Sequence, residues 1–204
     1  MKMFKLERCF LHFVLVHGGL HGAWCWYKVV NQLKSAGHNV TTLDLAAAGI
    51  NPKQVQGVNS FSEYNEPLIT FLASLLPEEK VILVGHSLVF VTATVVSQNL
   101  TFLGYLQEDF TLALSLVRPL PLFISDAKLL RKQTALTKYK NGRVSKVFII
   151  AEKDNIQTED FQRWIIEGTG PYADVKVIKD SDHMVMFSRP KKLSFELLKI
   201  AYEY

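Results

Sequence analysis

The sequence predicts an α/β fold built on a doubly wound, mostly parallel sheet. Short β-branched runs alternate with helical runs along the chain, which is the pattern of a parallel sheet covered by helices on both faces. The chain has 204 residues, of which 49% are hydrophobic and 21% charged. That size and balance are typical of one globular domain with a sizeable core. We therefore expect residues 1–204 to form a single domain.

Five short runs are rich in β-branched residues, and we expect them to form buried parallel strands. They lie at 12–16, 39–43, 80–84, 144–151 and 175–179. Helical patterns lie between them and carry start or stop signals, such as Gly37 after the first and the Ser60–Glu63 capping box. The expected helices are 23–36, 60–75, 108–117, 126–133, 158–167 and 190–204.

The charge and hydropathy patterns argue against nucleic-acid and membrane partners. The net charge is +4, but the densest basic stretch, 128–146, has one aromatic residue and no recognition motif. The apolar runs at 81–84 and 88–91 fall far short of the roughly 20 residues that span a bilayer. Charged residues interrupt the N-terminal segment where a signal peptide would need an apolar run. We expect a cytoplasmic protein, and a homodimer is compatible with the sequence.

The two cysteines, Cys9 and Cys25, are too few for a disulfide framework and lack metal-ligand spacing. We expect both to be buried small apolar side chains, with no metal site. The glycine-rich stretch "GGLHG" lacks the glycine spacing of a dinucleotide site and the lysine of a phosphate-binding loop. The sequence therefore predicts no nucleotide cofactor.

Reactive side chains are expected at the carboxyl ends of the parallel strands. The third run leads into Gly85-His86-Ser87, where a glycine two residues before a serine favours the sharp turn that exposes a nucleophile. A serine hydroxyl needs a positioned base. Of the six histidines, only His183 follows Ser87, and it lies just after the fifth run. The alternative is a surface histidine paired with Asp182.

The acid of such a site should follow the fourth run, which leads into "EKDNI". Asp154 is our choice, because a carboxylate there can hold the imidazole tautomer of His183; Glu152 is the nearest competitor. Backbone N–H groups of Gly19 and Leu88 are the expected oxyanion-hole donors.

Several segments resemble the plant methylesterase and hydroxynitrile lyase group of α/β hydrolases. They are "HFVLVHGG", "HGAWCWYKV", "VILVGHSL" and "DHMVMFSRP", and the match covers most of the chain outside about 88–137. The resemblance implies an α/β-hydrolase-type sheet, the nucleophile Ser87, the acid Asp154 and the base His183. It also implies catalysis without a metal or an organic cofactor.

The resemblance implies, as substrates, methyl esters of small plant metabolites or hormones, of the methyl salicylate, methyl jasmonate or methyl indole-acetate type. We expect the pocket for such a ligand to include Gly18, His86, Trp24 and Met184. Lyases of the group carry threonine and lysine at the positions of Gly18 and Met184. The resemblance therefore favours the esterase branch over the lyase branch.

The chain departs from the family pattern directly after the nucleophile. The family continues as Ser-x-Gly-Gly and then forms a helix, whereas Leu88 is followed here by a β-branched run at 90–95 that resembles the next strand. A parallel neighbour needs a crossover of about a dozen residues. We therefore expect a missing crossover helix and a reduced cap, with 97–137 as its remnant. A catalytically impaired isoform that binds small acids, or folds poorly, is the alternative to an active esterase.

Overall fold

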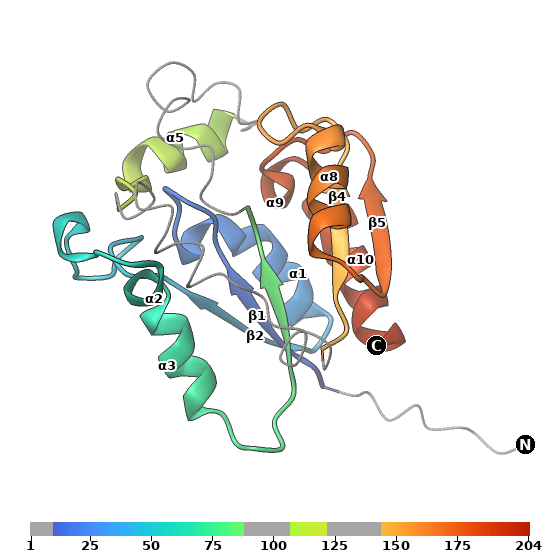
Figure 1. The fold of residues 1–204 in the computed structure, drawn as a ribbon, viewed down its shortest axis with the longest axis horizontal. Coiled ribbons are helices and arrows are strands. Elements are labelled where there is room, and N and C mark those ends of the chain that lie inside the picture. Colours follow the sequence, from blue (N-terminus) through green and yellow to red (C-terminus); the bar gives the residue numbers. More distant parts are fainter. Residues whose placement is uncertain (1–9, 88–106, 122–143) are drawn as a thin grey trace, which may run out of the picture.

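The computed structural model describes residues 10–87, 107–121 and 144–204 (Figure 1). Helices and strands alternate along the chain, as the sequence predicts. In chain order the elements are β1 His12–Val16, η1 Ala23–Trp26, α1 Tyr27–Ser35, β2 Asn39–Leu43, η2 Val55–Gly57, α2 Phe61–Tyr64, α3 Glu66–Ser74, β3 Val81–Gly85, α5 Gln107–Leu116, β4 Val147–Ala151, α8 Glu159–Thr169, β5 Asp174–Ile178, α9 Val185–Ser188 and α10 Pro190–Glu203.

All described strand pairs are parallel. One sheet has the order β2-β1-β3, and β4 pairs with β5. Within the first sheet, His12 is level with Asn39 on one side and with Val81 on the other, and Val16 is level with Gly85. The carboxyl ends of β1 and β3 are therefore adjacent. This parallel architecture confirms the predicted fold class.

Strand β1 lies at the centre of two hydrophobic clusters, because alternate side chains of a strand point to opposite faces. Phe13 and Leu15 belong to a cluster that includes residues of α1, α9 and α10. Val14 and Val16 belong to a second cluster, formed with residues 45–48 and with Tyr64 of α2. Figure 1 shows α2 and α3 on the opposite side of the molecule from α10. Both faces of β1 are thus covered.

The expectation that all five strands are buried is wrong for β3. Leu83 in this strand is 51% exposed, whereas Leu15 in β1 is fully buried. Among the described strands, β3 pairs with β1 along one edge, and its second edge has no partner. Val177 of β5 is 41% exposed as well. Continuous burial of a parallel strand requires cover on both faces, and Phe13, Val14 and Leu15 of β1 have it.

Several element boundaries differ from those expected. The helix expected at 60–75 is divided at Asn65 into α2 and α3, because Pro67 lacks an N–H and restricts the backbone of the residue before it. The helix expected at 23–36 begins as the 3₁₀ turn η1. Gly37 follows α1 with φ +93°, which confirms it as the residue that ends this helix. Cys25 is buried as expected.

Other expectations concern parts of the chain that the structure does not describe. The expected helix at 126–133, the strand-like run at 90–95, Cys9 and most of the cap remnant at 97–137 lie outside the described residues. Within the described ranges, no helix combines the length and apolar character needed to cross a bilayer.

Helix α5 is attached to helix α1 by a buried carboxylate. Asp109 is 1% exposed and accepts hydrogen bonds from Tyr27 Oη at 2.8 Å and Lys28 Nζ at 2.6 Å. Burial alone would lower the pKa of Lys28, but the hydrogen bond and charge of Asp109 outweigh it and raise that pKa. Beyond the helix, the Arg118 N–H donates to the carbonyl of Leu20 at 3.1 Å. The segment 107–121 therefore contacts the loop that follows β1.

Candidate active site

Ser87 lies at a sharp turn directly after β3. The strand ends at Gly85, and Ser87 has φ +42°. Residues other than glycine rarely adopt such a left-handed backbone, and a strained turn of this kind is the feature that presents the nucleophile of α/β hydrolases. Ser87 is thus not part of a continuous extended segment.

His183 and Asp154 form a hydrogen-bonded pair. His183 Nδ1 lies 2.8 Å from Asp154 Oδ2. The second carboxylate oxygen of Asp154 accepts the N–H groups of Ile156 and Gln157, both at 2.8 Å. Asp154 is 6% exposed. These hydrogen bonds therefore satisfy and orient a buried carboxylate. The pairing puts the imidazole proton on Nδ1 and leaves Nε2 able to accept another proton.

The two competing carboxylates have other partners. Glu152 Oε2 accepts the N–H of Asp180 at 2.9 Å. Asp182 Oδ1 accepts the N–H of Met184 at 2.9 Å, and burial raises the pKa of the Asp182 carboxyl. Of the three acids considered from the sequence, the structure brings Asp154 to the imidazole of His183.

Backbone hydrogen bonds brace the loops that carry this pair. The Lys153 N–H donates to the carbonyl of Ser181 at 2.8 Å. The buried Ser181 hydroxyl donates in turn to the carbonyl of Ile178 at 2.6 Å. The first bond joins the loop after β4 to the loop after β5, and both bonds lie close in sequence to Asp154 or His183. They help to fix the loops that carry these two side chains.

The serine turn contacts both the base loop and the loop after β1. His86 Nε2 lies 2.7 Å from the carbonyl oxygen of His183, and the two imidazole centroids are 5.0 Å apart. A Cβ added to Gly18 would lie 3.1 Å from Ser87 Cβ. Ser87 and His183 are therefore placed in one neighbourhood, although no hydrogen bond between described residues joins their side chains.

The loop after β1 offers one of the two expected oxyanion donors. The Gly19 carbonyl accepts a hydrogen bond from His21 Nδ1 at 2.8 Å, and the Gly19 N–H has no partner among the described residues. Leu20, which follows, has φ +68°. The second expected donor, Leu88, lies outside the described residues.

Two buried histidines hold this loop in place. His17 Nε2 accepts the N–H of Leu45 at 3.1 Å, so its proton resides on Nδ1, which donates to the carbonyl of Gly18 at 2.7 Å. Burial lowers the pKa of His17 and lowers that of His21 to about 4. Burial therefore favours the neutral form of both rings.

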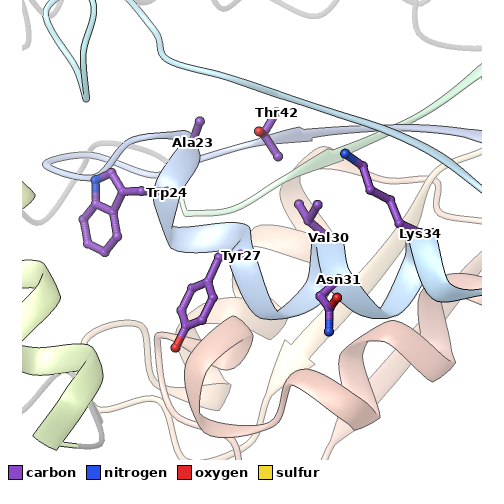
Figure 2. Close-up of a pocket in the computed structure, with 7 residues that line it drawn as sticks. All are labelled: Ala23, Trp24, Tyr27, Val30, Asn31, Lys34 and Thr42. Carbon is purple, nitrogen blue, oxygen red and sulfur yellow. The ribbon is translucent and has the colours of Figure 1, made fainter.

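Trp24 and Met184, expected in the substrate pocket, have different surroundings. The ring of Trp24 lies 5.4 Å from that of His21 and 6.1 Å from that of Phe187. Met184 is fully buried in the cluster that includes Phe13. An open cavity of about 420 Å³ lies beside α1. Figure 2 shows Trp24 and Lys34 at its two ends. The catalytic candidates do not line this cavity.

Sequence reasoning did not find Arg118 or His17 as residues that support the site. The hydrogen bond from the Arg118 N–H to the Leu20 carbonyl joins backbone atoms far apart in the chain, so no sequence pattern indicates it. The sequence "VHGG" does place His17 beside the glycines of the loop after β1, and this was the available signal. Within the described ranges, no group of three or more His, Cys, Asp or Glu side chains could hold a metal ion.

The chain is similar to known proteins over nearly its whole length. A family model described as alpha/beta hydrolase fold matches residues 12–88, ending where the sequence departs from the family pattern. Methyl jasmonate esterase 1 of Vitis vinifera is 40% identical over 266 positions, covering 99% of this chain and 100% of that protein. Because this chain has 204 residues, the relative carries residues that have no counterpart here.

Two further matches support the same assignment. Salicylic acid-binding protein 2 of Nicotiana tabacum is 34% identical, covering 95% of this chain and 98% of that protein. The crystal structure of tomato Methylketone Synthase I, complexed as an H243A variant with beta-ketoheptanoate, matches with a TM-score of 0.86 and 34% identity. It covers 96% of this chain and 99% of the other. This chain belongs to the plant methylesterase group of the α/β hydrolases.

Proposed function

We propose that this chain hydrolyses methyl esters of small plant carboxylic acids, using Ser87 as nucleophile, His183 as base and Asp154 as the acid that orients the base. Related proteins are named as methyl jasmonate esterase and methylesterase. The observation that carries the proposal is the 2.8 Å bond between His183 and Asp154. It lies on loops that contact the serine turn through His86.

The first half of the reaction would form an acyl-enzyme. Ser87 Oγ attacks the ester carbonyl while His183 Nε2 accepts the hydroxyl proton. Asp154 holds Nδ1–H and stabilises the imidazolium. The Gly19 N–H, together with that of Leu88, donates to the oxyanion that develops on the carbonyl oxygen. As the intermediate collapses, methanol leaves with the proton carried by His183.

The second half would release the acid. Water gives a proton to His183 Nε2 and attacks the acyl carbon, and the ester bond to Ser87 then breaks. The serine regains its proton from the imidazolium, and the carboxylic acid dissociates. No redox step and no additional co-reactant is required, since water is the only second substrate.

The proposal is tested by measuring methanol release from methyl jasmonate, methyl salicylate and methyl indole-acetate, with wild type and Ser87→Ala at equal concentration. We expect hydrolysis of at least one ester by wild type and only the uncatalysed rate with Ser87→Ala. Equal rates for the two proteins on every ester, and on a nitrophenyl ester, would contradict the proposal.

A second candidate is a binder of small acids, and two observations favour it. Within the described residues, the side chains of Ser87 and His183 share no hydrogen bond, and a relative is named as a salicylic acid-binding protein. Isothermal titration with salicylate and jasmonate distinguishes the candidates. If wild type and Ser87→Ala both bind these acids and neither hydrolyses an ester, the binder is supported.

A further inference from the structure

His86 connects the serine turn to the base loop through a side chain that the proposed chemistry does not use. It immediately precedes Ser87, and its own backbone N–H donates to the carbonyl of Val16 at 3.1 Å. Its ring nitrogen Nε2 lies 2.7 Å from the backbone oxygen of His183. A carbonyl oxygen can only accept, so Nε2 carries a proton and donates.

The other ring nitrogen of His86 is buried and has no partner among the described residues. It faces the loop after β1, where a Cβ added to Gly18 would lie 2.9 Å away. A proton on this nitrogen would be buried without an acceptor, which is costly. The ring is therefore held as one neutral tautomer, with the proton on Nε2.

The neighbours of His86 favour the same neutral state. Its ring lies 5.0 Å from that of His183 and 6.3 Å from that of Trp26, which meets it edge-on. Burial, followed by the nearby His183, lowers the pKa of His86 well below its usual value. A second cation here would oppose the imidazolium that His183 forms during the reaction, so a neutral donor suits the place.

We propose that His86 is a positioning residue, whose neutral Nε2–H holds the backbone of His183 against the turn that carries Ser87. The inference rests on the proposed function, because His86 can affect the rate only if Ser87, His183 and Asp154 carry out the reaction. Among the described residues, His86 is the one side chain that forms a hydrogen bond between the serine turn and the base loop. Displacements of about 1 Å in such arrangements cost about 100-fold in rate.

The test compares His86→Met, which fills similar volume without a donor, with His86→Gln, whose amide nitrogen lies about as far from Cα as Nε2 does. We expect His86→Met to lower kcat by about 10- to 100-fold with little change in KM, and His86→Gln to restore most of kcat. His38→Met is the matched control, since His38 is also buried but bonds Tyr202 and Leu11, away from the site. Its kcat should equal that of wild type.

The thermal midpoints of all four proteins separate a loss of positioning from a loss of folding. A folded His86→Met protein with the kcat of wild type would overturn the proposal, as would a His86→Gln protein as slow as His86→Met. If His86→Met does not fold, the decision rests on His86→Gln and on His86→Asn, whose shorter amide cannot reach His183. Equal kcat for these two folded variants would also overturn it.

A second readout keeps this inference separate from the proposed function. If wild type hydrolyses no ester, the proposed function fails, and the Nδ1–H signal of His183 in ¹⁵N-labelled protein decides the role of His86. We expect this signal in wild type and in His86→Gln, and its loss or broadening in His86→Met, because the imidazole then moves relative to Asp154. An unchanged signal in His86→Met would overturn the positioning role.

Discussion

The two halves of the candidate site hold their side chains by different means. The half that follows β1 and β3 contains three histidines whose rings bond backbone groups, at Gly18, Gly19 and His183. The half that follows β4 and β5 contains one histidine, whose ring bonds a buried carboxylate at 2.8 Å. This contrast is the reason why His183, whose ring bonds a buried carboxylate, is the proposed base.

The difference also extends to electrostatics. Burial lowers the pKa values of His17, His21 and His86, and each is therefore suited to a neutral, structural role at physiological pH. His183 has Asp154 to compensate the charge that it would gain on accepting a proton. In the proposed function, the first half carries the nucleophile and its supporting histidines, and the second half would transfer the proton.

The largest expected effect is at the carboxylate of the second half. Asp154→Asn should lower kcat by up to about 10⁴-fold, because an amide facing Nδ1 favours the wrong imidazole tautomer. The control is Glu152→Gln, in the same loop, whose side-chain oxygen can still accept from Asp180. Steady-state hydrolysis of one methyl ester by both variants measures the difference. Similar losses in both would contradict the assignment of the acid.

The next effect concerns the strands beneath the first half. Leu15→Ala in β1 removes a fully buried side chain and should cost about 2–5 kcal/mol of unfolding free energy. Leu83→Ala in β3 removes one that is 51% exposed and should cost less than about 1 kcal/mol. Chemical denaturation of both variants measures the two values. Equal losses would show that β3 is covered as well as β1.

A third effect is the acid sensitivity of the first half. The pKa of His21 is lowered from 6.5 to about 4 by burial, so the unfolded chain takes up its proton first. The stability that a neutral His21 provides is complete above pH 6.5 and is lost as pH falls towards about 4. The loss should amount to about 3 kcal/mol.

Denaturation at pH 7 and pH 4.5 should therefore show a smaller acid loss for His21→Gln than for wild type. Gln cannot titrate, whereas His17 and His86 titrate in both proteins and contribute equally to the two curves. The same loss in both proteins would mean that His21 takes up its proton as readily in the folded chain as in the unfolded chain, so that burial does not lower its pKa.

The smallest effect tests the close approach of the loop after β1 to the serine turn. Gly18→Ala places a Cβ 2.9 Å from His86 Nδ1, and such overpacking typically costs about 1–3 kcal/mol. Gly57→Ala is the control, since a Cβ there meets nothing within 4 Å. Thermal melts compare the two. A Gly18→Ala protein as stable as the control, with unchanged kcat, would show that this contact is loose.

Much of the fold followed from local patterns in the sequence. The β-branched runs at 12–16 and 39–43 gave the strand bounds found in β1 and β2. The exposure of Leu83 could not be predicted, because the pattern of β3 resembles that of a covered strand and cover depends on distant segments. The division of the helix at Asn65 could have been predicted from Pro67.

The site was predictable to a similar extent. Chain order and strand ends indicated Asp154 and His183, which the structure brings together. The bond from His86 to the His183 carbonyl joins residues far apart in the chain and involves a backbone atom, so no residue pattern encodes it. The roles of Ser87, Gly19 and Leu88 in catalysis remain predictions for experiment.

The most direct test of the account is covalent labelling of the protein with a fluorophosphonate, followed by peptide mass spectrometry. If the hydroxyl at the turn after β3 is activated by the imidazole on the loop after β5, the reagent should label one site, Ser87. Labelling should slow strongly in His183→Ala and vanish in Ser87→Ala. A wild-type protein that stays unlabelled, or is labelled equally fast without His183, would contradict the account.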